Sequence, residues 1–521
     1  MSIESVSSFD RKTVEEVIPD VRNTGNPQSN EDTGSDVLAE RQLGVPSAVF
    51  LIINKIIGAG IFSTPGTVLK KSGSVGLALI LWLVGGIISA CGSIVLLELG
   101  TGVPVSGGVK NYLERFIPSR RLAGTCLYVF YCIILQVSAG NCITFSNYLL
   151  LAAQTEVTTW KLRGVGIAGI SFAILLFAFF PKIAMKINNL LGVVKVFMLL
   201  FVIATGFAAL GGAIKVDKPD NFNTSTLFDG TLNNASNISS ALLSAIYSYQ
   251  GYDNANAVLS EVKNPVRTLK IALPLAMSMV TILNILANVA YFSGVSLDQF
   301  HNSSVTVAGS LFSNVFGENA GTRALPALVS LSALGHLIGI SKTIPVIIQE
   351  LSKEGALLFN NIFTTSKPYG TPIAALALHL IVTIIFVVAP PANEAFDFIT
   401  SLSSYPTTLM FFLCSLGILK LRYYDKDWDP PFKSPLIIIV SFIIASLFLL
   451  IAPFLPPEHN SSKIPYYLSS VVALAIAFLG IPYYLVRFIL LPKMFKYELV
   501  PEVRHLPDGS RVTRYQKVST N

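Results

Sequence analysis

One apolar segment, residues 45–71, sets the strongest limit on how this chain folds, because it is long enough to cross a bilayer and is interrupted in its middle. Residues 58–60 read Gly-Ala-Gly, and Ser-Thr-Pro follows at residues 63–65. Glycine allows backbone freedom, and Thr before Pro is typical of a helix N-cap followed by proline at the first helical position. Irregular backbone at membrane depth must be shielded by protein or face a wet cavity. The segment therefore predicts two half-helices with a binding site at the hinge between them.

The rest of the chain also has the composition of a membrane protein. Of its 521 residues, 52% are hydrophobic and only 13% are charged, and its mean hydropathy is +0.62, whereas soluble domains carry about 25% charged residues. Taking about 20 apolar residues per crossing, we predict an all-α integral membrane fold with twelve transmembrane helices. The spans are residues 45–71, 74–99, 121–150, 164–181, 188–212, 238–262, 268–295, 323–352, 372–390, 394–420, 434–453 and 465–491.

Charge and composition divide the chain into three parts. Residues 1–43 are polar and predict a disordered cytosolic N-terminal tail, residues 44–492 a transmembrane transporter domain, and residues 493–521 a cytosolic C-terminal tail. With the N-terminus in the cytosol, the inner loops hold 15 Lys and Arg residues and the outer loops 8, as the positive-inside rule favours. Five N-x-S/T glycosylation sequons fall in the predicted outer loops; they are Asn223, Asn234, Asn237, Asn302 and Asn460.

The predicted sixth span repeats the anomaly of the first. Residues 247–254 read Tyr-Ser-Tyr-Gln-Gly-Tyr-Asp-Asn and place polar and flexible residues at mid-membrane. Because five spans separate the two breaks, we predict a five-plus-five inverted repeat with the first and sixth spans broken. The N–H groups that start a half-helix attract a carboxylate, and the C=O groups that end one attract an ammonium, so the pair suits an amino acid zwitterion. The alternative is that Gly58 and Gly60 only allow close helix packing.

Several stretches carry a family resemblance. Gly-Ala-Gly-Ile-Phe at residues 58–62 resembles the signature of the amino acid–polyamine–organocation superfamily, and specifically its L-type amino acid transporter branch. The chain is most similar to the fungal high-affinity methionine permease group over residues 42 to 500. The stretches that carry this similarity are residues 72–80, 107–114, 139–141, 155–158, 331–335 and the run Glu-Val-Lys-Asn-Pro-Val-Arg-Thr-Leu-Lys at 261–270.

The resemblance implies the inverted-repeat fold and a substrate held between the first and sixth spans. By the family pattern, Ile56, Ala59 and Gly60 meet the backbone of the amino acid, Tyr247 takes the place of an aromatic gate, and Gln250 departs from the usual small or apolar residue. The substrate-binding residues expected are Ile56, Ile57, Gly58, Ala59, Gly60, Ile61, Tyr247, Ser248, Tyr249, Gln250 and Gly251.

Lys195, in the fifth span, is costly in a membrane unless it is paired or neutralised. It matches the position at which proton-coupled and L-type relatives carry a lysine in place of a bound sodium ion, so the resemblance implies a proton-coupling role. Burial disfavours the charged form, which agrees with reversible protonation. The alternative is a fixed structural cation that bridges the first, fifth and eighth spans.

Other charged residues are candidates for gates. Lys342 lies in the eighth span, whereas the methionine permease pattern has an arginine at the position of Val346 and no lysine at 342. This difference from the pattern either moves the positive charge of an inner gate by about one helical turn or indicates a protein with a different substrate or reduced activity. Asp253 is either a helix N-cap or a contact for the substrate ammonium. Lys55, with Glu98 and Glu261, either seals the inner vestibule by ion pairing or extends to the membrane interface.

The residue patterns point away from other classes of function. The five cysteines lie in apolar spans without CxxC spacing, and the five histidines show no metal spacing. No basic stripe for nucleic acid and no catalytic arrangement stands out, so we expect no metal, cofactor, nucleic-acid partner or enzyme activity. Instead, the sequence predicts a multi-pass plasma-membrane permease that imports methionine or a similar neutral amino acid, with proton symport as the driving force.

Two alternatives share the predicted fold. The first is a permease for a different amino acid or a polyamine, and the second is an amino acid sensor that binds its ligand without transporting it. By analogy with fungal permeases, Lys12 in the acidic N-terminal tail could bind a ubiquitin-ligase adaptor, and a plain solvated tail is the other reading. The oligomeric state has no signal in the sequence.

Overall fold

The structure is a computed structural model of the chain. It describes residues 44–58, 60–104, 107–117, 122–217, 219–257, 259, 262–302, 307–317, 323–366, 369–390, 395–457, 465–505 and 511–519. The predicted N-terminal tail, Ala59, Glu261 and Asn460 lie outside the described residues.

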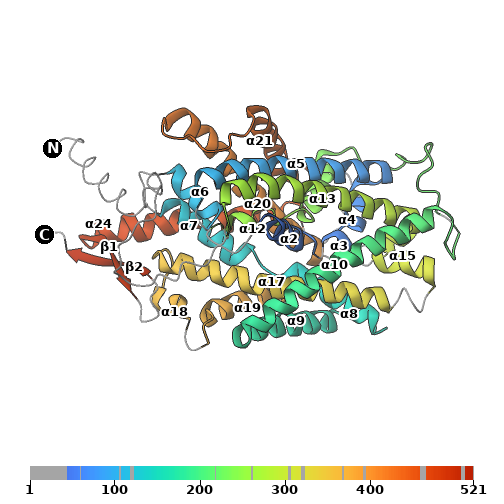
Figure 1. The fold of residues 1–521 in the computed structure, drawn as a ribbon, viewed down its shortest axis with the longest axis horizontal. Helices are drawn as coiled ribbons and strands as arrows, with labels where there is room; N and C mark the ends of the chain where they lie inside the picture. Colours follow the sequence, from blue (N-terminus) through green and yellow to red (C-terminus); the bar gives the residue numbers. More distant parts are fainter. Residues whose placement is uncertain are drawn as a thin grey trace.

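The described chain is a bundle of helices, most of which run along the long axis of the molecule (Figure 1). Ten helical stretches of the described chain are long and apolar enough to cross a membrane, and four of them combine consecutive elements of the list that follows. The helices are α2 Val45–Ile56, α3 Gly60–Ser63, α4 Pro65–Ser72, α5 Val75–Gly102, α6 Val109–Phe116, α7 Ala123–Phe130, η3 Tyr131–Leu135, α8 Ala139–Ala152, α9 Thr159–Phe179, α10 Pro181–Leu210, α11 Ala235–Tyr247, α12 Asn254–Ala257, α13 Pro265–Gly294, α14 Leu297–Asn302, α15 Val307–Phe316, α17 Ala324–Lys353, α18 Asn360–Thr364, α19 Ile373–Val388, α20 Ala395–Tyr424, α21 Leu436–Ile451, η5 Ala452–Phe454, α22 Leu468–Phe478, α23 Gly480–Tyr484, η6 Leu485–Leu490 and α24 Leu491–Met494.

The predicted sixth and ninth spans correspond to shorter helices. They are α11 and α19, with 13 and 16 residues, and neither is among the ten long helices. The fold is therefore that of a multi-pass, predominantly helical membrane protein, while the count of twelve spans and the inverted repeat stay predictions.

The first span is broken where the sequence predicts. Helix α2 ends at Ile56, because the backbone of Ile57 turns to an extended conformation (ψ 95°), and the helix resumes at Gly60. Pro65 stands at the first position of α4, as predicted, but the side chain of Thr64 does not cap that helix. Its hydroxyl instead donates to the Gly60 carbonyl at 2.9 Å. Thr64 therefore occupies the predicted N-cap position of α4 but does not cap that helix with its side chain.

The predicted sixth span is also broken. Helix α11 ends at Tyr247, residues 248–253 form turns, and α12 begins at Asn254. Gly251 adopts a φ of +120°, a conformation that side chains rarely take. Asp253 therefore directly precedes α12, at the position expected of an N-cap.

Two hydrophobic clusters form the core. The larger cluster includes Ile52, Trp82 and Tyr249 from the first, second and sixth spans. The smaller one includes Ile143, Ile170, Leu337 and Leu376 from α8, α9, α17 and α19. Helices of both clusters contribute to the cavity described below, so the cavity lies where two packed groups of helices meet.

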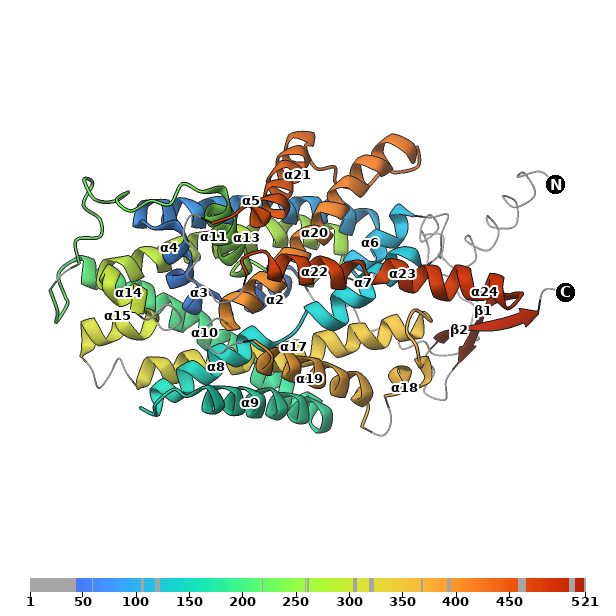
Figure 2. The same cartoon turned by 180° about the vertical axis from the view of Figure 1, so that it is seen from behind.

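The C-terminal segment departs from the all-α prediction. Strands β1 Tyr497–His505 and β2 Arg511–Ser519 pair antiparallel, with Tyr497 opposite Ser519. They follow α22 to α24, which run along the side of the bundle shown in Figure 2, and they lie at the same end as α6 and α18. We call this end the hairpin end. The all-α prediction is therefore incomplete for residues 493–521.

Candidate substrate site at two helix breaks

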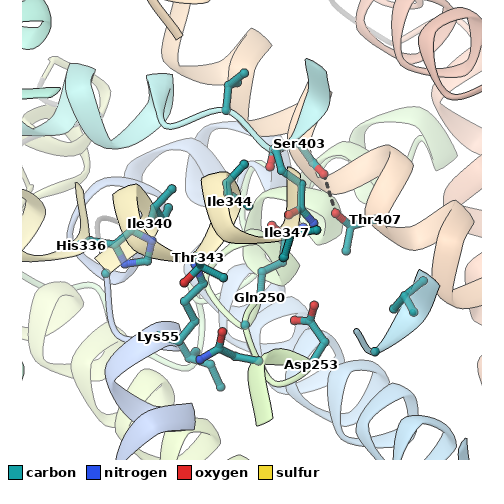
Figure 3. A pocket seen from close by; sticks show the side chains of 18 of the residues that line it. Lys55, Gln250, Asp253, His336, Ile340, Thr343, Ile344, Ile347, Ser403 and Thr407 are labelled. Atoms are coloured by element: carbon teal, nitrogen blue, oxygen red, sulfur yellow. Dashed lines mark hydrogen bonds between the residues drawn. The ribbon is translucent and has the colours of Figure 1, made fainter. Parts of the chain in front are cut away.

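A central cavity of about 130 Å³ lies beside the two breaks. Residues from α2, the α11–α12 turn, α17, α20 and the segment before α6 line it (Figure 3). Its lining consists of Lys55, Ile56, Gly58, Gly60, Gly107, Gly108, Val109, Tyr128, Tyr131, Gln136, Val137, Asn141, Tyr247, Gln250, Gly251, Asp253, Asn254, His336, Ile340, Thr343, Ile344, Ile347, Ser403 and Thr407.

The two breaks touch each other directly. A Cβ atom on Gly60 would lie 2.6 Å from the Ser248 hydroxyl and 2.8 Å from the Ser248 Cα atom. The hydroxyls of Thr64 and Ser248 are hydrogen-bonded at 2.8 Å. Gly60 therefore allows close packing as well as a break, so the two readings of this glycine describe one arrangement.

A second close approach joins the breaks. A Cβ atom on Gly251 would lie 2.7 Å from Cγ of Lys55. The stem of Lys55 thus runs against the turn of the sixth span, and both residues line the cavity. The hinge of one broken helix is held against the hinge of the other.

One face of α17 forms the opposite wall. His336, Ile340, Ile344 and Ile347 are spaced by three or four residues, so they project from the same side of the helix, as Figure 3 shows. His336 lies nearest the first break, where its Nδ1 atom would be 2.8 Å from a Cβ atom on Gly58. This wall is apolar apart from His336 and Thr343.

Three polar side chains in the cavity remain available to a ligand. Lys55 and Asp253 both line it, and neither takes part in an ion pair among the described residues. The buried Nε2 of Gln250 has no hydrogen-bond partner in the described part of the chain. A buried donor without a partner costs about 1–3 kcal/mol, so a ligand that accepts from Gln250 would offset this cost.

Lys195 supports the end of the first half-helix. Its Nζ donates to the carbonyl of Asn54 at 2.5 Å, and the residue is only 2% exposed. Because α2 ends two residues later, this carbonyl is among those that the broken helix leaves without an intrahelical partner. Gly192 allows the close approach, since a Cβ atom there would meet the Asn54 side chain at 2.7 Å. The ammonium thus stands at the negative end of a helix.

The end of the molecule opposite the hairpin end is closed by contacts. Thr67 donates to Asp397 at 2.9 Å and joins α4 to α20, and Lys71 donates to Ser244 at 3.1 Å and joins α4 to α11. The Tyr247 ring packs edge-on against Phe396, with the ring centroids 6.5 Å apart. The cavity instead extends toward the hairpin end, where residues 107–109 line it.

The structure groups only part of the predicted site. Ile56, Gly58, Gly60, Tyr247, Gln250 and Gly251 line the cavity, whereas Ile57, Ile61, Ser248 and Tyr249 are not in its lining. Tyr249 is fully buried and donates to the Trp82 carbonyl at 3.0 Å. Ala59 lies outside the described residues.

The predicted gate residues have different surroundings from those expected. Lys342 does not line the central cavity but a separate groove with Lys182 and Lys186. Glu98 is fully buried and pairs with Arg422 at 2.5 Å rather than with Lys55. Trp428 and the Ser434 amide also donate to Glu98. Another ion pair, Lys110 with Glu354, joins α6 to the end of α17.

The predicted glycosylation residues differ in accessibility. Asn223 is exposed in a loop, and its side chain accepts from Ser225. Asn234 caps α11 by accepting from the Ser236 amide at 2.8 Å, and Asn237 lies inside α11. Asn302 ends α14. Glycosylation stays a prediction; Asn223 is exposed, whereas Asn234 and Asn237 are half-buried.

Sequence reasoning did not single out His336 or the α17 wall. The spacing of an apolar face along residues 336–347 was visible, but such a face is also what a buried helix shows. Only the packing of α17 opposite the two breaks shows that this face lines the cavity. Among the described residues no group of three or more His, Cys, Asp or Glu side chains could hold a metal ion.

A multi-pass bundle with two touching helix breaks around a polar cavity is the architecture expected of a secondary transporter. Comparison with known proteins agrees: residues 43–478 match the family described as amino acid permease. The chain belongs to this family, within the amino acid–polyamine–organocation superfamily.

Individual relatives are more specific. The chain is 41% identical to the high-affinity methionine permease of Saccharomyces cerevisiae over 88% of its own length and 81% of the relative. It is 29% identical to the low-affinity methionine permease of the same yeast, over 92% and 88% of the two chains. It is also 29% identical to the b(0,+)-type amino acid transporter 1 of Mus musculus, over 80% and 82%. These relatives are named for transport rather than for an enzymatic reaction.

Proposed function

We propose that this amino acid permease imports methionine or a similar neutral amino acid across the plasma membrane by alternating access, driven by proton symport. The observation that carries the proposal is the contact between the two breaks, beside a cavity lined by a half-buried ammonium, of Lys55, and a half-buried carboxylate, of Asp253, neither of which has an ion-pair partner within 4 Å among the described residues. The 41% identity to a methionine permease supports the choice of substrate.

The cavity has a suitable group for each part of such a substrate. Asp253 and the carbonyls that end α11 favour the ammonium, while Lys55 and the N–H groups that start the second half-helix favour the carboxylate. Ile340, Ile344 and Ile347 offer an apolar wall to an uncharged side chain. A thioether needs no hydrogen-bond donor, so this wall suits methionine.

The unequal ends of the cavity support the proposal of alternating access. The Thr67–Asp397 and Lys71–Ser244 contacts close one end. We infer that this end faces outside, because the charge bias places the hairpin end in the cytosol. Protonation of Lys195 would strengthen its bond to the Asn54 carbonyl at the break, and so couple a proton to the hinge that holds the substrate.

Uptake into liposomes tests the proposal. Purified protein in proteoliposomes should accumulate labelled methionine faster with an inward proton gradient than without one. Unlabelled cysteine, branched-chain amino acids, aromatic amino acids and polyamines should each inhibit this uptake to the extent that they fit the cavity. Uptake no faster than in protein-free liposomes would overturn the assignment. If methionine uptake by Lys195→Met still depended fully on the proton gradient, Lys195 would have no role in proton coupling.

Asp253→Asn tests the ammonium contact without a change of shape. A hydrogen bond to a charged group contributes about 1.5–3 kcal/mol, so methionine uptake should fall by about 10- to 150-fold. The matched control is Asp229→Asn, which makes the same change in the exposed loop before α11. Equal uptake by the two variants would contradict the contact.

A further inference from the structure

A second cavity lies on the back of α17. This lysine groove, of about 530 Å³, is formed by Lys182, Lys186 and Lys342 with Met185, Val346 and Pro372 among its other lining residues. It lies where the α9–α10 connection meets α17 and the start of α19, and it is separate from the central cavity.

The groove carries positive charge without a described counter-charge. None of its three lysines takes part in an ion pair among the described residues, and its lining contains no Asp or Glu. Lys182 and Lys186 are four residues apart in the first turns of α10, so they project from one face and repel each other. The N-terminal ends of α10 and α19 add the positive ends of two helices. An anion placed here would relieve the repulsion.

The surroundings of the groove are apolar and exposed. Phe179, Phe180 and Ile183 expose 46%, 57% and 51% of their surfaces next to the lysines. The Phe179 ring packs edge-on against Tyr369 with centroids 5.0 Å apart. Aromatic side chains beside lysines are typical of the boundary between acyl chains and headgroups. The combination fits an anion with a hydrocarbon tail better than a free ion.

The groove shares a helix with the substrate site. Lys342 and Val346 face the groove, while Thr343, Ile344 and Ile347 on the same two turns of α17 line the central cavity. Gln349, which also lines the groove, donates to the Thr364 carbonyl at 2.9 Å and so ties this part of α17 to α18. A ligand in the groove therefore contacts the helix that forms one wall of the central cavity.

We propose that the lysine groove binds the phosphate-bearing headgroup of an anionic phospholipid from the leaflet at the hairpin end, and that the bound lipid holds α17 and raises the transport rate. The binding step stands on the groove alone, and only the effect on rate rests on the proposed function. Each lysine near an anionic headgroup contributes about a fivefold gain in affinity.

The test uses the purified full-length chain and a charge-matched control. The groove variant changes its three lysines together to Gln: Lys182, Lys186 and Lys342. The control variant makes the same change at three lysines outside the groove, on loops or helix ends: Lys263, Lys426 and Lys493. All three control lysines are exposed. Native mass spectrometry after detergent extraction from vesicles of phosphatidylcholine with phosphatidylserine measures the retained lipid.

We expect wild type and control to retain phosphatidylserine and the groove variant to bind it on the order of a hundredfold more weakly. Thermal unfolding of the three proteins in detergent checks that all are folded. Equal retention by the groove variant and the control, or no preference over phosphatidylcholine, would overturn the site. Displacement of the lipid by millimolar inorganic phosphate would show a free-phosphate site and would overturn the lipid as occupant.

The rate effect is measured in the same vesicles. Methionine uptake by wild type and control should be several-fold faster with phosphatidylserine than with phosphatidylcholine alone, whereas the groove variant should not respond to the lipid. An equal response in the groove variant would overturn the rate effect. If no variant transports methionine in any vesicle but the retention pattern holds, the proposed substrate fails and the lipid site stands.

Discussion

Gln250 places a buried amide donor in the central cavity without a partner among the described residues. Gln250→Leu should therefore remove a ligand contact without harming the fold. A hydrogen bond contributes about 0.5–1.5 kcal/mol, so the apparent KM for methionine should rise about 2- to 12-fold. The thermal midpoint of the ligand-free protein should stay equal or rise, because an unpaired donor is gone. A lower midpoint with an unchanged KM would contradict this role.

The contribution of Lys195 to the stability of the fold can be measured separately from transport. In Lys195→Met the Asn54 carbonyl loses the ammonium that it accepts from, and leaving a buried acceptor unpaired costs about 1–3 kcal/mol. We expect a lower thermal midpoint for the purified protein in detergent. Lys426→Met, on an exposed residue, is the control and should leave the midpoint nearly unchanged. The same midpoint in both variants would show that the hydrogen bond does not support the hinge.

At the scale of elements, the hinges depend on the absence of side chains. Gly251 has a φ of +120° and contacts Lys55, whereas Gly212 has a φ of +96° and nothing within 4 Å of its Cβ position. Both Ala substitutions strain the backbone, but only Gly251→Ala also pushes the two broken spans apart. We expect Gly251→Ala to lower methionine uptake at least tenfold more than Gly212→Ala at equal surface expression. Equal loss would mean that backbone strain alone matters.

The broken helices were the elements that sequence reasoning located best. Gly58, Gly60 and the polar run at residues 247–254 are visible because such residues at mid-membrane conflict with an unbroken helix. The helix start predicted at Thr64 and Pro65 is also found, but without the side-chain capping bond, because the Thr64 hydroxyl donates to the Gly60 carbonyl instead.

Other features depend on contacts that a linear pattern does not contain. The direction of Lys342 is set by the rotation of α17, which turns it into the lysine groove while Thr343 faces the cavity. Glu98 finds Arg422 rather than Lys55 because α20 packs against the end of α5. The β-hairpin was missed because its strands mix charged and apolar residues without a marked alternation.

At the scale of the whole molecule, the closed end is held by few polar contacts. Asp397→Ala removes the acceptor of the Thr67 hydroxyl, and a contact of about 0.5–1.5 kcal/mol shifts a two-state equilibrium about 2- to 12-fold. In a Tyr247→Cys background, Asp397→Ala should speed modification by a membrane-impermeant maleimide added outside. Asp220→Ala, in the loop before α11, is the control. No difference between the two would contradict the gate or its orientation.

Glu98 also bears on how the protein is made. Its carboxylate is fully buried, and its arginine partner lies 324 positions later in the chain. At about 5–20 residues per second, synthesis of the intervening segment takes on the order of tens of seconds. Throughout that interval the second span carries an acid whose counter-ion does not yet exist. The nascent protein therefore must keep this end of the helix hydrated or chaperoned until α20 is made, and chains cut short before Arg422 should be marked for degradation.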